Sequence, residues 1–235
     1  MIALTHHLDI GGVAYPVVEA ETRLVLSGIG RGEFQVRSED ALEVGVLLRY
    51  SIGLNDAAWP VLLGVTTEVS HMADGLWAVT ARELTAALEA PASLALRHVT
   101  PAQVLAALES STGLRFLLPA DAPYLLERQP YFMSQGDARS ALEQMGVAWG
   151  QTQPIWAQLP DGRVFWGDWL DSPFNTDPLV IAQGLIQERD GSGTLELPCL
   201  PALRPGMALS IDGATGFIDA VTHTGNRTLL TWSAP

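Results

Sequence analysis

The stretch TPAQVLAALESSTG, residues 100–113, carries the strongest local signal in the chain. Thr100 is a favourable N-cap residue, and Pro101 suits the first helical position because no backbone donor is needed there. Gly113 follows the last apolar turn and is typical of a helix end. The stretch therefore predicts a helix over residues 101–112.

A second helix is predicted at Asp137–Met145, and Gly146 is expected to end it. Its apolar residues recur at helical spacing and share one face. They are Ala138, Ala141, Leu142 and Met145.

A hairpin follows this second helix. The turn Pro-Asp-Gly at residues 160–162 separates the apolar runs 154–158 and 163–169. Asp-Gly supplies the positive φ that a tight hairpin turn needs. With short strands at residues 94–98 and 114–118, the helices and the hairpin predict a compact α+β insert.

The segments on both sides of the insert are predicted to be β, because alternating residues and Gly-containing turns punctuate them. The polar segment DSPFNTD, residues 171–177, suits a linker. The sequence predicts a mainly β chain with an α+β insert. Two small β-barrel modules, residues 1–90 and 171–235, would flank a small α+β domain, residues 91–170.

The β segments contain two long strand signals and a turn signal. The sequence predicts a strand at Leu42–Tyr50 and another at Leu179–Ile186. It also predicts a turn at Asp190-Gly191.

Composition limits the kinds of protein that the chain can be. It has 235 residues, of which 48% are hydrophobic and 17% are charged, and its mean hydropathy is +0.19. No apolar run approaches the ~20 residues of a membrane-spanning helix. The apolar residues must be buried in a core or in contacts with other chains, which leaves open a large core or an obligate assembly.

The formal net charge is −13, and all 13 basic residues are arginines. Proteins that read nucleic-acid sequence need basic clusters on the phosphates, so sequence-specific nucleic-acid binding is not expected. Binding to an anionic membrane surface is disfavoured for the same reason.

Cysteine usage and the N-terminus add two expectations. The lone Cys199 excludes a disulfide framework and a Cys-based zinc site within one chain. The first residues, MIALTHH, lack the basic region and apolar core of a signal peptide, so synthesis in the cytoplasm is expected.

Candidate metal ligands are sparse. His6, His7 and Asp9 form the densest group of ligand-type residues. Adjacent residues of a strand point to opposite faces, so both histidines cannot readily bind one ion. No metal site and no cofactor are predicted.

Catalytic motifs are missing as well. There is no G-x-S-x-G elbow, and Cys199 lies in the apolar run LPCLP, where burial would raise the pKa of its thiol. The acidic residues form no recognisable pair, and GIGRG at residues 28–32 is a turn rather than a dinucleotide-binding loop. The chain is predicted not to be an enzyme and to have no catalytic residues.

The tryptophans of the hairpin leave two interpretations open. Trp156, Trp166 and Trp169 could form a platform for stacking sugars, or they could belong to the core. Trp166 and Trp169 are three residues apart, so on a regular strand they face opposite sides. One is expected to pack on the second helix and the other to be exposed.

Four stretches follow one another over about residues 60–235 in a distinctive order. They are LWAVTAREL at residues 76–84, TPAQVLAAL at 100–108 with TGL at 112–114, ARSALEQM at 138–145 leading to DGRVFW at 161–166, and LRPGM at 203–207 running to IDAVTH at 218–223. In this order they resemble the tail-hub family of long-tailed bacteriophages. That family includes late control protein D, the baseplate hubs of contractile phages, the hubs of Mu-like phages and the base of type VI secretion spikes. The chain is short for the family, whose larger members carry longer insertions and extra domains.

The resemblance implies a structural protein of the virion tail that is made in the cytoplasm of a bacterial host. Three copies would form a ring of pseudo-sixfold symmetry around a central channel, with the insert outside the ring or between subunits. The implied partners are a distal tail protein or tail-tube ring, tail-tip, spike or central-fibre proteins, and the C-terminus of the tape-measure protein. DNA would pass only transiently, and acidic residues lining the channel would repel its phosphates.

Two alternatives remain beside the tail hub. One is a tail-tip module that binds a carbohydrate or receptor through the Trp hairpin, and the other is a tail-associated cell-wall hydrolase. For the hub, exposed apolar residues near the edges of the β modules are the candidate subunit contacts. They are Trp59, Phe174, Phe217 and Trp232.

Overall fold

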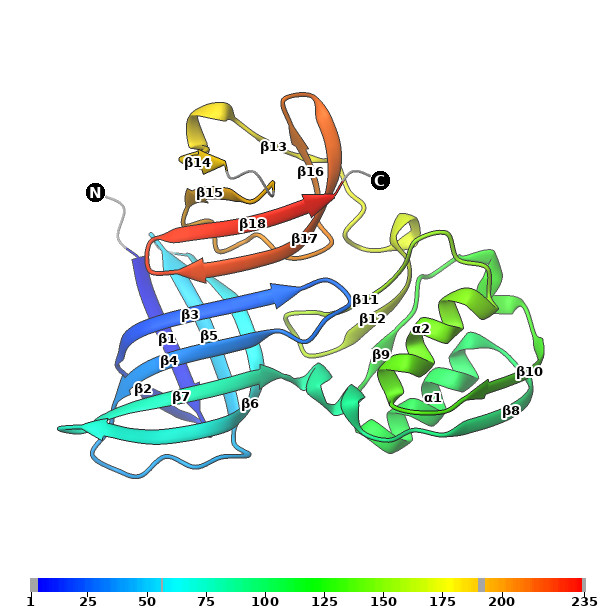
Figure 1. Cartoon of the computed structure of the whole chain (residues 1–235), viewed down its shortest axis with the longest axis horizontal. Helices are drawn as coiled ribbons and strands as arrows, with labels where there is room; N and C mark the ends of the chain where they lie inside the picture. Colours follow the sequence, from blue (N-terminus) through cyan, green and yellow to red (C-terminus); the bar gives the residue numbers. More distant parts are fainter. Residues whose placement is uncertain (1–3, 56, 190–192, 234–235) are drawn as a thin grey trace. The chain divides into compact units, whose positions relative to one another are not determined.

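The computed structural model is mainly β and contains an α+β insert, as the sequence predicts (Figure 1). The residues that it describes are 4–55, 57–189 and 193–233. The chain divides into two compact units: unit 1 combines residues 1–83 with 177–235, and the insert is residues 84–176. The α+β insert is thus continuous in sequence, whereas unit 1 is assembled from the two segments that flank it.

Unit 1 is built almost entirely of strands. In its first segment they are β1 (Leu4–Ile10), β2 (Val13–Tyr15), β3 (Val17–Val25), β4 (Arg31–Arg37), β5 (Leu47–Leu54), β6 (Ala57–Ala73) and β7 (Leu76–Glu83). In its closing segment they are β13 (Leu179–Ile181), β14 (Glu188–Arg189), β15 (Leu195–Pro198), β16 (Ala208–Ile211), β17 (Ala214–Thr224) and β18 (Arg227–Ser233), with a short 3-10 helix, η4 (Gln183–Leu185).

One continuous sheet joins the two segments. Its strand order is β14-β15-β18-β17-β3-β4-β7-β6-β5-β1-β2, and neighbouring strands along this path are antiparallel. The junction between segments is β3 with β17, where Val25 lies opposite Ala220 and Glu21 lies opposite Thr224. β16 pairs with the first part of β17 and, in parallel, with β13.

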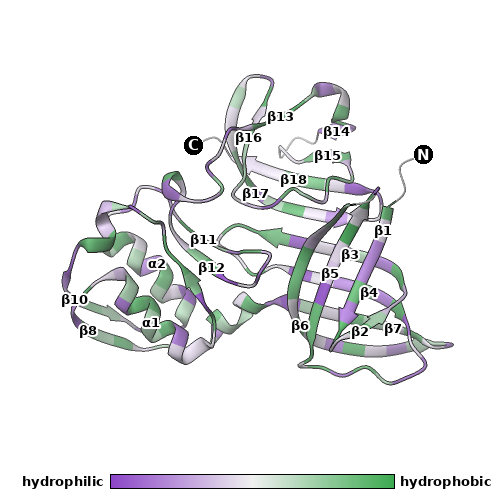
Figure 2. Cartoon of the chain, turned by 180° about the vertical axis from the view of Figure 1, so that it is seen from behind, coloured by the Kyte–Doolittle hydropathy of each residue, from purple (hydrophilic) through white to green (hydrophobic). Residues whose placement is uncertain are grey.

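Each segment of unit 1 nevertheless has its own hydrophobic core. The first core gathers side chains from β1 and β3–β7, together with Cys199 from the closing segment. The second core is formed by residues 181–230. Apolar and polar residues alternate along the strands (Figure 2), and in β3 and β4 buried residues alternate with exposed ones. One face of the sheet therefore packs on the cores, and the other is polar. That each segment forms a barrel of its own stays a prediction.

The insert combines two helices with two small sheets. Its elements are η1 (Leu84–Glu89), β8 (Leu94–Val99), α1 (Pro101–Thr112), β9 (Phe116–Leu117), η2 (Pro123–Leu126), β10 (Gln129–Ser134), α2 (Ala138–Ala148), β11 (Pro154–Gln158), β12 (Val164–Asp168) and η3 (Trp169–Asp171). β8 pairs with β10, and β12 lies between antiparallel β11 and parallel β9.

Helix α1 has the predicted bounds, and its ends have the predicted chemistry. The Thr100 backbone N–H donates to Gln103 Oε1 at 3.0 Å. Gly113 has φ 72°, and its N–H donates to Glu109 O, which satisfies one of the last carbonyls of the helix.

The prediction that Gly146 ends helix α2 is wrong. The helix continues to Ala148, and Gly146 is buried within it. A Cβ atom at residue 146 would lie 2.5 Å from Pro154 Cβ, so this glycine permits close packing of β11 on the helix. The chain leaves the helical conformation at Trp149 and Gly150, where φ of Gly150 is 61°.

The predicted bounds of two strands in unit 1 are also wrong. Residues 38–46 form a loop, and β5 starts at Leu47 because the Thr66 side chain holds this loop in place. Thr66 Oγ1 donates to Glu43 O at 2.9 Å and accepts from Val46 N at 3.0 Å. β13 ends at Ile181, where the chain turns into η4. The turn predicted at Asp190-Gly191 lies outside the described residues.

Candidate functional site

The four aromatic residues predicted as subunit contacts differ in their surroundings. Trp59, Phe217 and Trp232 are half-buried in unit 1, and Trp232 packs against the second core. Phe174 is only 9% exposed and lies edge-on to Phe165 in the insert, with ring centroids 6.1 Å apart. The expected exposure of Phe174 is therefore wrong, because the turn-rich segment folds back over the hairpin. A contact role for the other three stays a prediction.

The two N-terminal histidines point in different directions, as the strand argument requires. His6 Nδ1 lies 2.6 Å from Tyr50 Oη, and the two rings stack. His7 Nε2 instead lies 3.2 Å from Thr5 Oγ1. Within residues 4–55, 57–189 and 193–233, no cluster of three or more His, Cys, Asp or Glu residues could hold a metal ion.

The hairpin tryptophans are core residues. Trp156, Trp166 and Trp169 are 2%, 1% and 6% exposed. Trp166 Nε1 donates to Leu142 O of α2 at 3.1 Å, which confirms that one tryptophan packs on the second helix.

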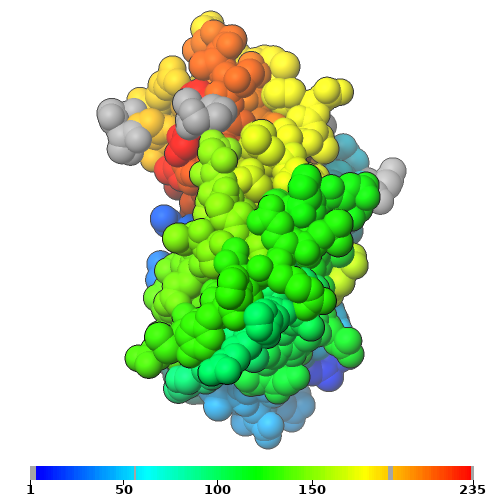
Figure 3. Space-filling model, turned by 90° about the vertical axis from the view of Figure 1, so that its right-hand side faces the viewer, coloured from blue at the N-terminus to red at the C-terminus, as the bar shows by residue number. Residues whose placement is uncertain are grey.

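The expected exposure of Trp169 is wrong because the strand ends before it. Asp168 Oδ1 accepts from Leu170 N at 3.0 Å, and Asp168 Oδ2 accepts from Thr152 N and Gln153 N. These bonds turn the chain into η3 and direct Trp169 inward. The hairpin therefore offers no exposed tryptophan platform for sugars, and the face of the insert that Figure 3 turns to the viewer, in green, has no deep hollow among its described residues.

The polar face of the unit 1 sheet carries two rows of like charges that run across neighbouring strands. The arginine row consists of Arg23 on β3, Arg31 on β4 and Arg82 on β7, each directly opposite the next. Thr222 on β17 lies opposite Arg23 at the end of the row. The glutamate row lies two residues away on the same strands and reaches β6. Its glutamates are Glu21, Glu33 and Glu68, and Thr224 and Thr80 occupy the positions opposite Glu21 and between Glu33 and Glu68. All of these residues are exposed or half-buried.

This arrangement is not the most stable one for an isolated sheet. Like charges directly opposite each other destabilise a strand pair, and Arg23–Arg31 and Glu21–Glu33 are both such pairs. Arg31 and Glu33 form an ion pair along β4 at 3.8 Å, but both side chains are more than half exposed, so it stabilises the sheet little. Local conflicts of this kind are expected where a surface serves a function.

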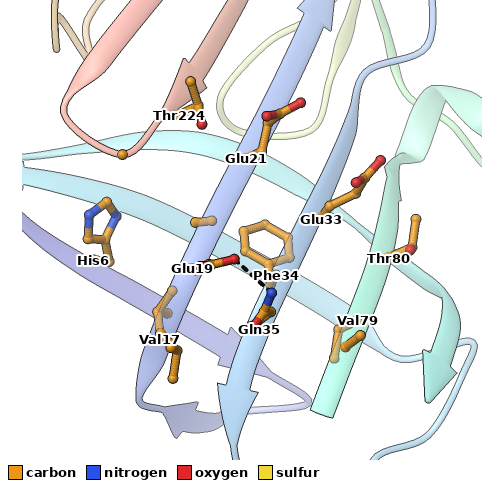
Figure 4. Close-up of a pocket in the computed structure, with 14 residues that line it drawn as sticks. His6, Val17, Glu19, Glu21, Glu33, Phe34, Gln35, Val79, Thr80 and Thr224 are labelled. Carbon is orange, nitrogen blue, oxygen red and sulfur yellow. Dashed lines mark hydrogen bonds between the residues drawn. The ribbon is translucent and has the colours of Figure 1, made fainter. Parts of the chain in front are cut away.

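A hollow of about 590 Å³ lies on this sheet (Figure 4). Glu21 and Glu33 project from neighbouring strands beside it, and the Gln35 side chain donates to Glu19 Oε2 at 2.7 Å. His6 is the one basic side chain of its lining, and burial lowers the pKa of that imidazole. The lining carries three carboxylates, Glu19, Glu21 and Glu33, whose negative charge disfavours a bound phosphate.

The half-buried Arg204 joins the closing segment to the first one, and its charge lies near the buried carboxyl group of Glu83. The Arg204 guanidinium donates to Pro60 O at 2.8 Å and to Val61 O at 3.4 Å. Glu83 is 4% exposed, and its Oε2 accepts from Gly30 N at 2.8 Å. Burial raises the pKa of Glu83 to about 7, although the Gly30 hydrogen bond and the nearby Arg204 act against this shift.

Sequence reasoning did not identify the two charged rows. The signal within each strand was visible, since charged residues alternate with apolar ones in VVEAETRLV and RGEFQVR. The alignment of those charges across strands depends on register, which single strands do not specify.

Comparison with known proteins gives few sequence relatives. No protein-family model matches the chain. It is 26% identical over 191 residues to an uncharacterized 58.7 kDa protein encoded in the lys 3' region of Haemophilus phage HP1. The match covers 80% of this chain and 34% of that protein, so the chain spans about a third of the length of this relative.

Solved structures give a clearer result. The 43 kDa tail protein of prophage MuSo2 from Shewanella oneidensis superposes with a TM-score of 0.75 at 9% identity, covering 99% of both chains. The fold is that of a phage tail protein. An Escherichia coli component of the type VI secretion system, described as similar in structure to bacteriophage T4 tail proteins, superposes with a TM-score of 0.68 at 17% identity, covering 97% of this chain and 76% of that one. These relatives are tail and secretion-system proteins rather than enzymes.

None of the helices in the described part of the chain is long and apolar enough to cross a membrane.

Proposed function

We propose that the chain is a tail-hub subunit, three copies of which form a ring around a channel that joins the tail tube to the tail tip. The observation that carries this proposal is the continuous antiparallel sheet across both β segments of unit 1. It joins two β segments, each with its own hydrophobic core, within one chain. If each segment acts as one module, three chains would contribute six modules to a ring.

The ends of the sheet support closure of such a ring. Among the described residues, β14 at one end of the sheet pairs only with β15, and β2 at the other end pairs only with β1. A strand edge with unpaired N–H and C=O groups can pair with another chain. The two edges differ, and repeated head-to-tail contact between different surfaces generates a closed ring when the rotation fits.

The polar face of the sheet is the surface that we assign to the channel. Its opposite face is packed on the two cores, so only the polar face is free to meet water. It carries Glu19, Glu21, Glu33 and Glu68 beside the arginine row, so it is not lined mainly by arginine. Carboxylates on this face would repel DNA phosphates during passage and keep them from adhering. The arginine row would attract phosphates, so repulsion and attraction would alternate along the channel.

The partners follow from the position of a hub in a virion tail. We propose a distal tail protein or tail-tube ring on one side, tip, spike or central-fibre proteins on the other, and the tape-measure C-terminus in contact with the ring. A Francisella complex of PdpA with VgrG contains a chain of the same fold, with a TM-score of 0.57 over 98% of this chain and 57% of that one. That likeness supports a role in contact with other tail components.

The ring is tested by measuring the mass of the purified chain with light scattering and imaging it by negative-stain electron microscopy. The proposal expects a mass of three 25.2 kDa chains and class averages with threefold symmetry and a central hole. Subunits that assemble only on a partner would form the ring after mixing with the tail-tube or distal tail protein. A chain that remains monomeric both alone and with these partners contradicts the proposal.

A further inference from the structure

The two-stranded sheet β8–β10 of the insert has one packed face and one exposed face. On the packed face, Phe132 is 4% exposed, and the centroid of its ring lies 5.7 Å from that of Trp149. On the other face, Tyr131 and Met133 are 52% and 53% exposed. Alternation along β10 therefore turns an aromatic and a thioether side chain toward solvent.

These two side chains form one surface with their partners on β8, which runs beside β10 (Figure 1). Tyr131 Oη donates to Met133 Sδ at 3.8 Å, so the two side chains are in contact. Tyr131 lies directly opposite Arg97, and Met133 lies directly opposite Ala95. Direct cross-strand partners share a face of the sheet, and Ala95 and Arg97 are both exposed. Ala95, Arg97, Tyr131 and Met133 together form the insert face.

The insert face is positively charged, although the chain carries 26 acidic and 13 basic residues. Neither β8 nor β10 contains Asp or Glu. Within residues 4–55, 57–189 and 193–233, Arg97 forms no ion pair. At one end of the sheet, Arg128 Nη1 donates to His98 O at 2.8 Å and adds a second guanidinium. The exposed Glu127 at that end offsets one of the two arginines, so a net positive charge is left.

The carboxylate beyond the other end of β10 has partners of its own. Asp137 is the N-cap of α2, and its Oδ1 accepts from Ser140 N at 2.7 Å. Its Oδ2 lies 3.9 Å from the guanidinium of Arg139. Asp137 therefore leaves the charge of Arg97 uncompensated.

The outer edges of this sheet can take another strand. Among the described residues, β8 and β10 pair only with each other. Unpaired backbone groups along a strand edge can bond an added extended chain. Tyr, Met and Arg are also residue types that are enriched at protein interfaces. The insert face thus combines the geometry of strand addition with the composition of a protein contact.

Charge complementarity selects the occupant. Exposed charges more than about 8 Å apart are largely screened at physiological ionic strength, so the local positive charge outweighs distant carboxylates of the chain. A nucleic acid carries phosphates along its whole length and would meet those carboxylates as well. A short acidic protein segment would meet only the insert face.

We propose that the insert face binds an extended acidic segment of a partner protein. Carboxylates of the segment would pair with Arg97 and Arg128, and an apolar side chain beside the small Ala95 would pack on Tyr131 and Met133. The contact belongs to the insert alone and does not depend on the proposed ring.

The probe is a fluorescent peptide of Glu-Thr-Val-Thr repeats, compared with a peptide in which lysine replaces glutamate. As a strand, the peptide presents Glu and Val alternately on one face, which matches the alternation of Arg97 and Ala95. In fluorescence anisotropy with the full chain at low salt, the acidic peptide should bind at least roughly tenfold more tightly than the basic one. Added salt should weaken this binding.

Two variants of the full chain locate the contact. Arg97→Glu and Tyr131→Ala should each weaken binding of the acidic peptide at least roughly tenfold. The controls Arg115→Glu and Leu170→Ala make comparable changes at exposed positions of the insert outside β8 and β10, and they should leave binding unchanged. Circular dichroism and thermal unfolding check that each variant keeps the native fold.

Several outcomes would overturn the inference: no binding of the acidic peptide, equal binding of both peptides, or equal losses in the control variants. A thymidine oligonucleotide that binds the native chain as tightly as the acidic peptide, and is lost in Arg97→Glu, would identify a phosphate ligand and overturn it as well. If Arg97→Glu dissociates a native trimer in light scattering, a second copy is the occupant, and the inference fails while the ring stands. A chain that binds the peptide as expected but never forms trimers contradicts the ring alone.

Discussion

Glu83 and His223 are buried titratable residues of unit 1 whose pKa values shift in opposite directions relative to the ordinary values. Burial raises the pKa of Glu83 to about 7. Burial, with the Arg204 charge nearby, lowers the pKa of His223 to about 4. His223 Nδ1 lies 3.1 Å from Thr228 Oγ1, so the neutral imidazole is held in the sheet. For both side chains, folding favours the uncharged form over the charged form.

The first prediction concerns Glu83→Gln. The carboxyl group of Glu83 ionises near pH 4.5 when unfolded and near pH 7 when folded, so its contribution to stability is full below pH 4.5 and is lost as pH rises to 7. At pH 8 the variant should have a free energy of unfolding higher than the native chain by up to about 3 kcal/mol, and at pH 4.5 the two should agree. Glutamine keeps an acceptor for Gly30 N. Urea unfolding at pH 4.5, 6 and 8 measures this, with exposed Glu19→Gln as control.

His223 gives the opposite slope. The pKa of its imidazole falls from 6.5 to about 4 on folding, so its contribution is full above pH 6.5 and is lost as pH falls toward 4. In the native chain this loss offsets the gain from Glu83 protonation over the same range. Between pH 6.5 and 4.5 the Glu83→Gln variant should therefore lose stability more steeply than the native chain. Parallel profiles would show that Glu83 does not titrate in this range.

At the scale of elements, glycine has different roles in the two helices of the insert. Gly113 ends α1 with a left-handed conformation, and no atom lies within 4 Å of a Cβ placed there. Gly146 has a helical conformation within α2, and the space for its Cβ is filled by Pro154. The same residue type therefore ends one helix and permits close packing in the other.

The second prediction is that Gly146→Ala destabilises the chain, although alanine favours helix by about 1 kcal/mol over glycine. The added Cβ would lie 2.5 Å from Pro154 Cβ and would push β11 away from α2, at a net cost of about 1–3 kcal/mol. Thermal unfolding measures the loss. Gly184→Ala is the control, because nothing lies within 4 Å of a Cβ at that position. Equal stability of the two variants would contradict this packing role.

At the scale of the whole molecule, the third prediction concerns Trp232→Ala. Trp232 is half-buried beside the second core, and a Cβ at Gly216 would lie 2.7 Å from its Cε3 atom. If its exposed part contacts the next subunit, the variant should lose trimers at concentrations where its fold is intact. Light scattering and urea unfolding on the same samples separate the two effects. Normal trimers, or normal tails assembled from the variant, would show that Trp232 is dispensable for the ring.

The fourth prediction tests the channel face through charge reversal of the glutamate row. The variant Glu21→Arg with Glu33→Arg would join the arginine row into a basic surface, so each ring should acquire DNA binding that weakens steeply as salt rises. The native ring should not bind DNA in 150 mM salt. Electrophoretic mobility shifts over a salt series measure this. The control Glu127→Arg with Glu143→Arg makes the same charge change on exposed positions of the insert. Equal binding by both variants would show that net charge, and not this face, controls DNA contact.

The features that could be predicted from sequence are those with short-range causes. The bounds of α1, the Asp-Gly hairpin and the alternation of charged residues along β3 and β4 each depend on residues a few positions apart. The errors at Gly146, Trp169 and Phe174 arise from contacts outside the local pattern. Gly146 packs on Pro154 and Phe174 on Phe165, whereas Trp169 is turned inward by the hydrogen bonds of Asp168.

The sequence by itself determined a mainly β chain with an α+β insert, the absence of recognisable catalytic motifs, and the order of stretches that resembles tail hubs. Only the tertiary structure decided that β3 pairs with β17 to join the two β segments, and that arginines and glutamates align in separate rows. The physical reason is that strand propensity and alternation are properties of a single strand. Strand partners and register depend on contacts between residues that, for β3 and β17, lie nearly the whole chain apart.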